Sequence, residues 1–285
     1  MLATLNEVLA FAKKNNLAIG AFNTPTLETL DAVIEASEEL GLPVIVSHAE
    51  LHEPQAPLMK IGPVMVERAK SAKVPVCVHL DHGEHIDYIE TAMKIGFTSV
   101  MYDGSLLPVE ENITNTKKVV ELAHVLGVSV EGEIGALPSR EDGSSNGTID
   151  PTSLYTDPDL ALRFVSETGI DALAASFGTA HGIYKTTPKL DFPRIEKITA
   201  MTGVPLVMHG GSGVSPNDYL TAISCGVRKI NYYSYMAREG VFAAKKFIEE
   251  CNPTFFHEVA YVAKEAMKAD AKKAMVHFSN GFLRG

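Results

Sequence analysis

Short apolar runs rich in β-forming residues alternate with amphipathic helical segments along nearly the whole chain. Eight strands are expected, at residues 18–22, 43–47, 76–80, 99–102, 128–133, 172–176, 206–208 and 229–232. Helical patterns lie between them, at residues 27–40, 64–71, 86–95, 113–126, 159–168, 193–202 and 216–225. Eight strand–helix units in steady alternation predict a parallel sheet, and eight strands close a (β/α)8, or TIM, barrel.

The helix ends and the chain length agree with this α/β barrel. Glycine stands between a helical pattern and the next strand at positions 41, 96, 127, 169, 203 and 226, as a C-capping residue does. A barrel of roughly 250 residues plus an extension fits the 285 residues. We therefore expect one domain over residues 1–285. Two further helices, at 235–248 and 255–277, form a C-terminal extension over 235–285 that either covers the barrel or forms a dimer face.

Composition narrows the possible partners and compartment. The formal net charge is −10, which argues against a nucleic-acid or anionic-membrane partner. Cys77, Cys225 and Cys251 are too few and too scattered for a disulfide framework, and we expect reduced thiols. No apolar run reaches the length of about 18 residues needed to span a bilayer, and no basic segment precedes an apolar one at the start. These features predict a cytoplasmic protein.

Three histidines occupy equivalent places in the expected barrel. His82, His181 and His209 each follow an expected strand and stand beside a glycine. In a TIM barrel the reactive residues lie at the carboxyl ends of the strands. Three imidazoles can fill three positions of a zinc tetrahedron and leave the fourth for substrate. His79 competes with His82 as the first ligand, but it lies deeper in its strand and we interpret it as a supporting or core residue.

The metal ligands alone leave the reaction open. A zinc ion with an open position can activate water, as in a hydrolase, or polarise a ketone oxygen. Asp81, beside the first ligand, supplies a carboxylate that can move protons in the same pocket.

A candidate phosphate loop favours the second reaction. The run Gly210-Gly211-Ser212-Gly213 follows the seventh strand and leads into a helix, so its N–H groups can cradle a phosphate at the usual barrel site. Asn231 and Ser234, which end the eighth strand, and Lys185, four residues beyond His181, could complete that site.

Over nearly its whole length the chain resembles the class II, zinc-dependent ketose-bisphosphate aldolases. The resemblance rests on motifs in the family's order, among them His-x-Asp-His-Gly. They are residues 20–23 (GAFN), 79–83 (HLDHG), 101–105 (MYDGS), 131–135 (EGEIG), 141–143 (EDG), 154–158 (LYTDP), 178–185 and 209–213 (HGGSG).

The resemblance implies a TIM barrel, a homodimer or homotetramer, that reversibly cleaves a ketose 1-phosphate or bisphosphate. The products are dihydroxyacetone phosphate and an aldehyde, formed through a zinc-stabilised enediolate. It implies zinc on the three histidines, Asp81 as acid/base, Glu141 as the loop carboxylate that moves the carbon-bound proton, and a monovalent cation (Na⁺ or K⁺) near the phosphate. Asp103 and Glu133 would be polar groups near the metal or a second metal position. Substrate and phosphate contacts would come from Asn23, Ser47, Gly182, Lys185, Gly210, Gly211, Ser212, Asn231 and Ser234.

The segment that carries Glu141 is long and polar. Residues 135–157 have no apolar periodicity, and such a loop after a barrel strand is more often functional than accidental. Closure of the loop over substrate would exclude water from the enediolate.

Two segments depart from the family. Tyr233 stands where relatives have a small or acidic residue, and it could reshape the aldehyde pocket or point into the helix layer. His48 to Glu53 replace a small Ser- or Gly-rich turn; we expect a polar pocket wall or solvated loop there rather than a second metal site. No arginine is evident for a distal phosphate, and Arg284 is a weak candidate. A zinc hydrolase and a catalytically degenerate sugar-phosphate-binding barrel remain the alternatives.

Overall fold

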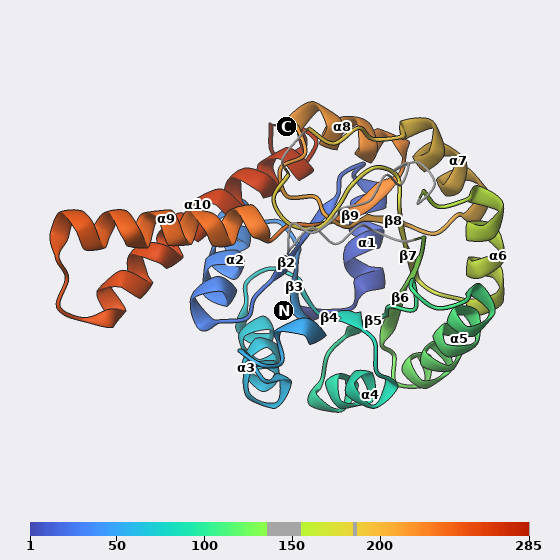
Figure 1. Cartoon of the computed structure of the whole chain (residues 1–285), viewed down its shortest axis with the longest axis horizontal. Helices are drawn as coiled ribbons and strands as arrows, with labels where there is room; N and C mark the ends of the chain where they lie inside the picture. Colours follow the sequence, from blue (N-terminus) through green and yellow to red (C-terminus); the bar gives the residue numbers. More distant parts are fainter. Residues whose placement is uncertain (136–154, 185–186, 285) are drawn as a thin grey trace.

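A computed structural model describes residues 1–135, 155–184 and 187–284 of the chain. Within these residues, eight parallel strands form a closed barrel with helices around its outside (Figure 1). The barrel runs in chain order from β2 to β9, and the pairing of β2 with β9 closes it. Its strands are β2 (Ile19–Asn23), β3 (Val44–Ala49), β4 (Val76–Gly83), β5 (Ser99–Tyr102), β6 (Ser129–Ile134), β7 (Ala172–Ala175), β8 (Leu206–Met208) and β9 (Val227–Asn231). The expected (β/α)8 fold is confirmed.

The helices follow the strands as the alternation predicted. They are α2 (Leu27–Leu40), α3 (Leu58–Ser71), α4 (Ile86–Ile95), α5 (Val109–Val125), α6 (Pro158–Thr168), α7 (Phe192–Thr202) and α8 (Pro216–Cys225). Helices α2, α4 and α8 begin and end at the predicted residues. Helix α3 begins six residues before the predicted start, because Pro63 lies inside it instead of ahead of it. Its first turns bury Leu58 and Ile61 against the core, and this packing outweighs the hydrogen bond that a proline removes.

Two N-terminal elements were not predicted. Strand β1 (Leu2–Ala3) pairs with the start of β4. Helix α1 (Leu5–Lys14) begins at a capping box, in which Thr4 and Glu7 satisfy each other's backbone N–H groups. The buried face of α1 packs with the small and medium residues that fill the barrel interior. The amino-terminal end of the barrel is therefore covered, and the opposite end is left for the site.

Polarity inside the barrel changes along the strands. One apolar group includes Ile19, Ala21, Ile45, Cys77 and Ala174 and packs with α1. Fully buried charged or polar side chains belong to the same strands, with His79 on β4, Glu131 on β6 and Lys229 on β9. Burying such groups is costly unless they pair with one another, so their partners matter for the site.

The C-terminal helices α9 (Ser234–Cys251) and α10 (Phe256–Phe278) form a hairpin that projects away from the barrel (Figure 1). Near the barrel, Lys264 and Lys268 of α10 form ion pairs with Glu35 of α2. Near the hairpin tip, Phe255 is 60% exposed and Phe256 is 83% exposed. None of the helices in the described residues is both long and apolar enough to cross a membrane.

Candidate active site

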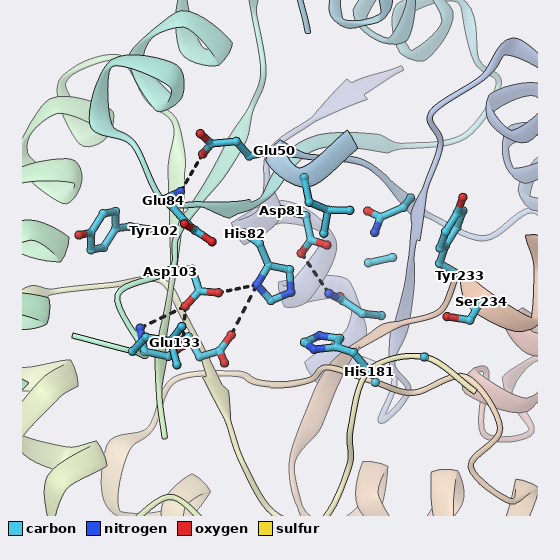
Figure 2. A pocket seen from close by; sticks show the side chains of 18 of the residues that line it. Glu50, Asp81, His82, Glu84, Tyr102, Asp103, Glu133, His181, Tyr233 and Ser234 are labelled. Carbon is cyan, nitrogen blue, oxygen red and sulfur yellow. Dashed lines mark hydrogen bonds and ion pairs between the residues drawn. The ribbon is translucent and has the colours of Figure 1, made fainter. Parts of the chain in front are cut away.

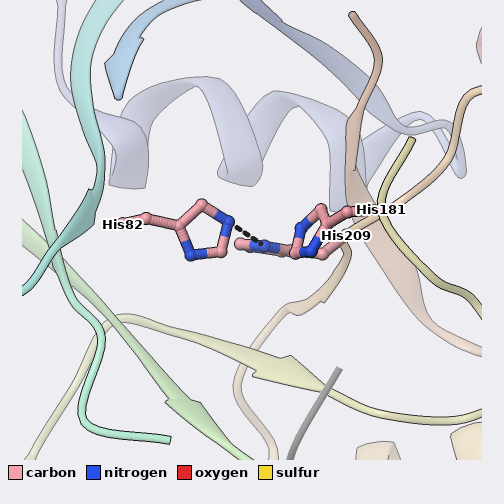
Figure 3. A group of neighbouring side chains, drawn as sticks. All are labelled: His82, His181 and His209. Carbon is pink, nitrogen blue, oxygen red and sulfur yellow. Dashed lines mark hydrogen bonds between the residues drawn. The ribbon is translucent and has the colours of Figure 1, made fainter. Parts of the chain in front are cut away.

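His82, His181 and His209 converge at the carboxyl end of the barrel (Figure 3). Their ring centroids lie 4.7 to 5.7 Å apart. The His209 Nδ1 atom is 3.0 Å from the His82 Nε2 atom, and one nitrogen from each of the three rings lies within 4.8 Å of the others. Rings at these separations, supplied by β4 and by the loops after β7 and β8, have the spacing of ligands for one metal ion.

The backbone at His82 is itself unusual. His82 has a φ of +47°, in the left-handed region that non-glycine residues seldom adopt. The pairing of β4 with β5 shifts register between Leu80 and Gly83, which is an irregularity of the β-bulge kind. Such a conformation costs on the order of 1–3 kcal/mol. The bulge turns the His82 ring toward the other two histidines.

A carboxylate fixes the orientation of the His82 ring. Asp103, just beyond β5, lies with Oδ2 2.6 Å from His82 Nδ1. The other Asp103 oxygen accepts hydrogen bonds from the N–H and the hydroxyl of Ser105, at 3.1 and 2.6 Å. A histidine ligand whose outer nitrogen is held by a carboxylate presents its inner nitrogen to the metal in a fixed direction. Nε2 of His82 is therefore the nitrogen turned toward the other two histidines.

A buried chain of charges does the same for His209. Glu131 Oε1 lies 2.8 Å from His209 Nε2, and Glu131 Oε2 lies 2.7 Å from Lys229 Nζ. Lys229 Nζ is also 3.3 Å from His79 Nε2, and His79 Nδ1 is 2.8 Å from the Ser99 hydroxyl. Burial disfavours the Glu131 carboxylate, but Lys229 outweighs this and lowers the pKa of Glu131 to about 2. Glu131 therefore stays ionised and holds Nε2 of His209, which leaves Nδ1 turned toward His82.

His181 has no such partner. Its Nε2 atom is buried and has no hydrogen-bond partner among the described residues. Burial, followed by the charges of His82 and His209, lowers the pKa of His181 to about 3. The Tyr184 hydroxyl accepts from the N–H of Ala180 and donates to the carbonyl of Gly210, both at 2.8 Å, and so ties the loop of His181 to the loop of His209. A neutral, orphaned imidazole nitrogen in a polar centre fits a metal ligand.

The charge around the three rings is negative. Burial opposes protonation of His82, but Asp81 and Asp103 outweigh it and raise the pKa of His82 to about 10. The same carboxylates attract a divalent cation, which would displace that proton on binding. Burial, with Asp103 nearby, raises the pKa of Glu133 well above its ordinary value. His82, Asp103 and Glu133 form a second group with metal-ligand spacing, as the resemblance implied.

Asp81 lies next to the three histidines and is 2% exposed. Burial raises its pKa, but the positive charges of His82 and Lys229 outweigh burial, and the net effect holds the pKa below the ordinary range. The Asn231 amide donates to Asp81 Oδ1 at 3.1 Å (Figure 2). Asp81 is therefore an ionised carboxylate, held in position by Asn231 beside the three histidines.

A cavity of about 560 Å³ opens onto this group. Most of the residues proposed for the site from the sequence line it, namely Asn23, Asp81, His82, Asp103, Glu133, His181, Gly182, Gly210, Ser212, Asn231 and Ser234. His209 lies buried directly beneath. Ser47 and Gly211 are not among the lining residues, and Lys185 and Glu141 lie outside the described residues.

The two segments that depart from the family behave differently. His48 is fully buried and its Nε2 lies 2.9 Å from the Tyr88 hydroxyl, which donates to Glu53. No metal-ligand group among the described residues includes His48 or His52. The ring of His52 instead packs edge-to-face against Tyr233, which lines the cavity. Tyr233 therefore faces the pocket.

Comparison with known proteins supports an aldolase. The family model for class II fructose-bisphosphate aldolase matches residues 3–281. The fructose-bisphosphate aldolase of Staphylococcus aureus is 42% identical over 236 residues, which cover 81% of this chain and 80% of the relative. The chain belongs to the class II fructose-bisphosphate aldolase family. The Staphylococcus epidermidis enzyme is 41% identical over 87% of the chain and 85% of its own length.

Solved structures agree with this membership. The crystal structure of the YdjI aldolase from Escherichia coli superposes with a TM-score of 0.88 at 35% identity, covering 99% of both chains. The protein is therefore an enzyme of the aldolase class, a carbon–carbon lyase. Class II membership favours the aldolase over the hydrolase and the degenerate barrel that the sequence had left open.

Sequence reasoning missed the buried support of the site. Lys229 is a fully buried residue of β9, and Glu131 alternates with Glu133 along β6. A charged residue in an inward-facing strand position is a usable signal, because it needs a buried partner of opposite charge. The sequence did not identify that partner, because Glu131 lies 98 residues away from Lys229.

Proposed function

We propose that the protein is a zinc-dependent aldolase that reversibly cleaves a ketose 1-phosphate or ketose bisphosphate into dihydroxyacetone phosphate and an aldehyde. The observation that carries the proposal is the convergence of His82, His181 and His209 beside the ionised Asp81. When bound to the three imidazoles, zinc would draw electron density from the ketone and stabilise the enediolate. The donor set fits zinc, because two inner nitrogens are aimed by carboxylates and the third ring has an orphaned nitrogen.

Asp81 is the acid/base for the carbon–carbon bond in this mechanism. In the cleavage direction its carboxylate takes the proton of the hydroxyl on the aldehyde-forming carbon. The bond to the neighbouring carbon then breaks, the aldehyde C=O forms, and the electron pair is left on the dihydroxyacetone phosphate fragment as the enediolate. The low pKa of Asp81 keeps it available as a base, and Asn231 holds it in position. Glu141 would then return a proton to carbon.

Glycines, hydroxyls and a helix end are proposed to hold the ketone-side phosphate. Gly182, Gly210, Ser212 and Ser234 line one part of the cavity, and Ser234 is also the first residue of α9. Backbone N–H groups and a helix N-terminus favour an anion. Gly211, Lys185, Asn23, Asn231 and Ser47 complete the proposed substrate contacts, with a Na⁺ or K⁺ ion near the phosphate.

We further propose that the protein is a cytoplasmic homodimer or homotetramer. Each chain would be a single barrel domain over residues 1–285, with residues 235–285 as its helical extension. The projecting hairpin of α9 and α10 supports assembly, because Val241, Phe242, Ile248 and Phe256 are each at least half exposed on it. Sedimentation of the full chain tests this, and a monomer at micromolar concentration would refute it.

Exchange of hydrogen between dihydroxyacetone phosphate and solvent tests the proposed chemistry. The zinc-loaded enzyme should release tritium from the carbon that becomes nucleophilic, and a chelator should abolish both this exchange and turnover. Borohydride with substrate should leave activity unchanged, because no lysine Schiff base is required. Turnover that survives complete zinc removal, or the absence of exchange by the zinc-loaded enzyme, would contradict the proposal.

A further inference from the structure

One part of the cavity differs in chemical character from the part with the proposed phosphate contacts. It is lined by Glu50 and Leu51 of the short helix η1 (Glu50–His52), by Glu84 after β4, and by Leu106 and Leu107 after β5. We call these five residues the distal wall. Glu50 and Leu51 belong to the segment expected from the sequence as a polar pocket wall or solvated loop, whereas Glu84, Leu106 and Leu107 were not proposed for the site.

Glu84 presents an exposed carboxylate to the cavity. Its side chain is exposed, and its carboxylate has no hydrogen-bond or ion-pair partner among the described residues. In Figure 2 it lies beside His82 and Asp103, on the side of the cavity opposite Tyr233 and Ser234. The oxygens of this exposed side chain are available to accept hydrogen bonds from a ligand.

Glu50 fixes the position from which Glu84 projects. Its Oε2 atom accepts hydrogen bonds from the N–H groups of Glu84 at 2.8 Å and His85 at 3.3 Å. Its Oε1 atom lies 2.6 Å from the Nδ1 atom of His85. Three interactions with one carboxylate hold the turn after β4 in place. The Glu84 side chain is therefore set at the cavity by the backbone, while Glu50 is itself fully engaged.

The described residues that line the cavity are predominantly acidic, which also disfavours a second phosphate. Among the described lining residues, carboxylates are contributed by Glu50, Asp81, Glu84, Asp103 and Glu133, and none of these lining residues is a lysine or arginine. A phosphate dianion placed near Glu84 would meet several carboxylates, and the imidazole of His85 in the same lining is already paired with Glu50. Hydroxyl groups, by contrast, are donors that a free carboxylate binds well.

We propose that the distal wall selects an uncharged hydroxyaldehyde, so that the ketose substrate carries a single phosphate, on its ketone side. This inference rests on the proposed aldolase function and specifies its substrate class. Glu84 accepts hydrogen bonds from hydroxyls of the aldehyde fragment and repels a phosphorylated one. Leu106 and Leu107, which are 88% and 37% exposed, offer apolar surface to the carbon chain.

The condensation reaction of the zinc-loaded full-length enzyme tests the proposal. With dihydroxyacetone phosphate held fixed, kcat/KM is measured for glyceraldehyde and for glyceraldehyde 3-phosphate at low and high salt. We expect the wild-type enzyme to favour glyceraldehyde by about tenfold or more. Glu84→Gln should shift the ratio toward the phosphorylated aldehyde by about threefold, and Glu84→Lys by about tenfold or more. High salt should weaken the Glu84→Lys shift.

Glu121→Lys is the matched control, because it makes the same change of charge at an exposed position on α5. It should leave the ratio within about twofold of the wild-type value. A wild-type preference for glyceraldehyde 3-phosphate, or an equal shift in Glu84→Lys and Glu121→Lys, would overturn the inference.

Hydrogen exchange of dihydroxyacetone phosphate distinguishes failure of the proposed aldolase chemistry from failure of aldehyde selection by the distal wall. Exchange that proceeds while the phosphorylated aldehyde is preferred refutes only the selection by the distal wall. Loss of exchange in the zinc-loaded wild-type enzyme refutes the aldolase chemistry itself.

Discussion

The two ends of the cavity use different kinds of group. The end proposed for the ketone-side phosphate is lined by Gly182, Gly210, Ser212 and Ser234, small residues that expose main-chain groups. Ser212 Oγ even accepts a hydrogen bond from the backbone N–H of Tyr233, so the two loops are locked together. The distal wall consists of long or exposed side chains such as Glu84 and Leu106. Recognition by backbone is hard to alter by substitution, whereas recognition by projecting side chains is easily altered.

Asp81 lies between these two ends, and its replacement should have the largest effect. Asp81→Asn removes the base that accepts the hydroxyl proton but keeps the side-chain shape beside Asn231. We expect turnover to fall by roughly a hundredfold or more. Bound zinc, measured by metal analysis, should stay near one per chain, because Asp81 is not one of the three histidine ligands.

Asp81 is proposed to act on the aldehyde oxygen and not on the carbon-bound proton of dihydroxyacetone phosphate. Asp81→Asn should therefore reduce the rate of condensation by a larger factor than the rate of hydrogen exchange between dihydroxyacetone phosphate and solvent. An equal loss of hydrogen exchange and of condensation would show that Asp81 serves both ends of the cavity, and would contradict this assignment.

Gly211→Ala tests the backbone-built end. A Cβ atom at this position would lie 2.5 Å from the Ile230 Cγ2 atom and 2.7 Å from the Asn231 carbonyl oxygen, so the loop has to shift. We expect the KM for dihydroxyacetone phosphate to rise about tenfold, because displacement of phosphate-binding N–H groups weakens charged hydrogen bonds worth about 1.5–3 kcal/mol each.

The rise in KM of Gly211→Ala should be the same whichever aldehyde is the second substrate, with thermal unfolding monitored to separate binding from folding. A change that depends on the aldehyde would contradict the division into two ends.

Tyr233→Ala should have the smallest effect, confined to the aldehyde. The ring lines the cavity and packs against His52, whereas its backbone N–H, which holds Ser212, is kept in the variant. We expect relative kcat/KM among uncharged aldehydes of different length to change by about threefold to tenfold, as loss of a packed aromatic contact predicts. The KM for dihydroxyacetone phosphate should change by less than about twofold, and an equal change in both would refute the assignment.

The fold followed from the sequence because its signals are local. Hydrophobic runs, amphipathic periodicity and C-capping glycines act over a few residues, and eight such units have one common closed solution. Helix α1 was missed because it precedes β2, the first strand of the barrel, and so lies outside the strand–helix alternation on which the prediction was based. Its role, covering the barrel interior, depends on packing with strands far along the chain. The start of α3 was also missed, because proline disfavours a helix interior, and the packing that keeps Pro63 inside the helix is not visible in the local sequence.

Part of the site also followed from the sequence. The three histidines and Asp81 were predicted because each stands at the end of a strand, and parallel strands bring such ends together. The ion pair of Lys229 with Glu131 was not predicted, because no local pattern links residues on β9 and β6. The placement of Glu84 depends in the same way on Glu50, 34 residues earlier.

The amino-acid order by itself determined the barrel, the positions of the metal-ligand candidates and the glycine loop, since all three depend on short-range preferences repeated along the chain. Only the tertiary structure decided which nitrogen of His82 and of His209 is held by a carboxylate and which is turned toward the other histidines, and which charges meet in the cavity. These depend on distances between side chains on different strands, and electrostatic energy varies steeply with distance and burial.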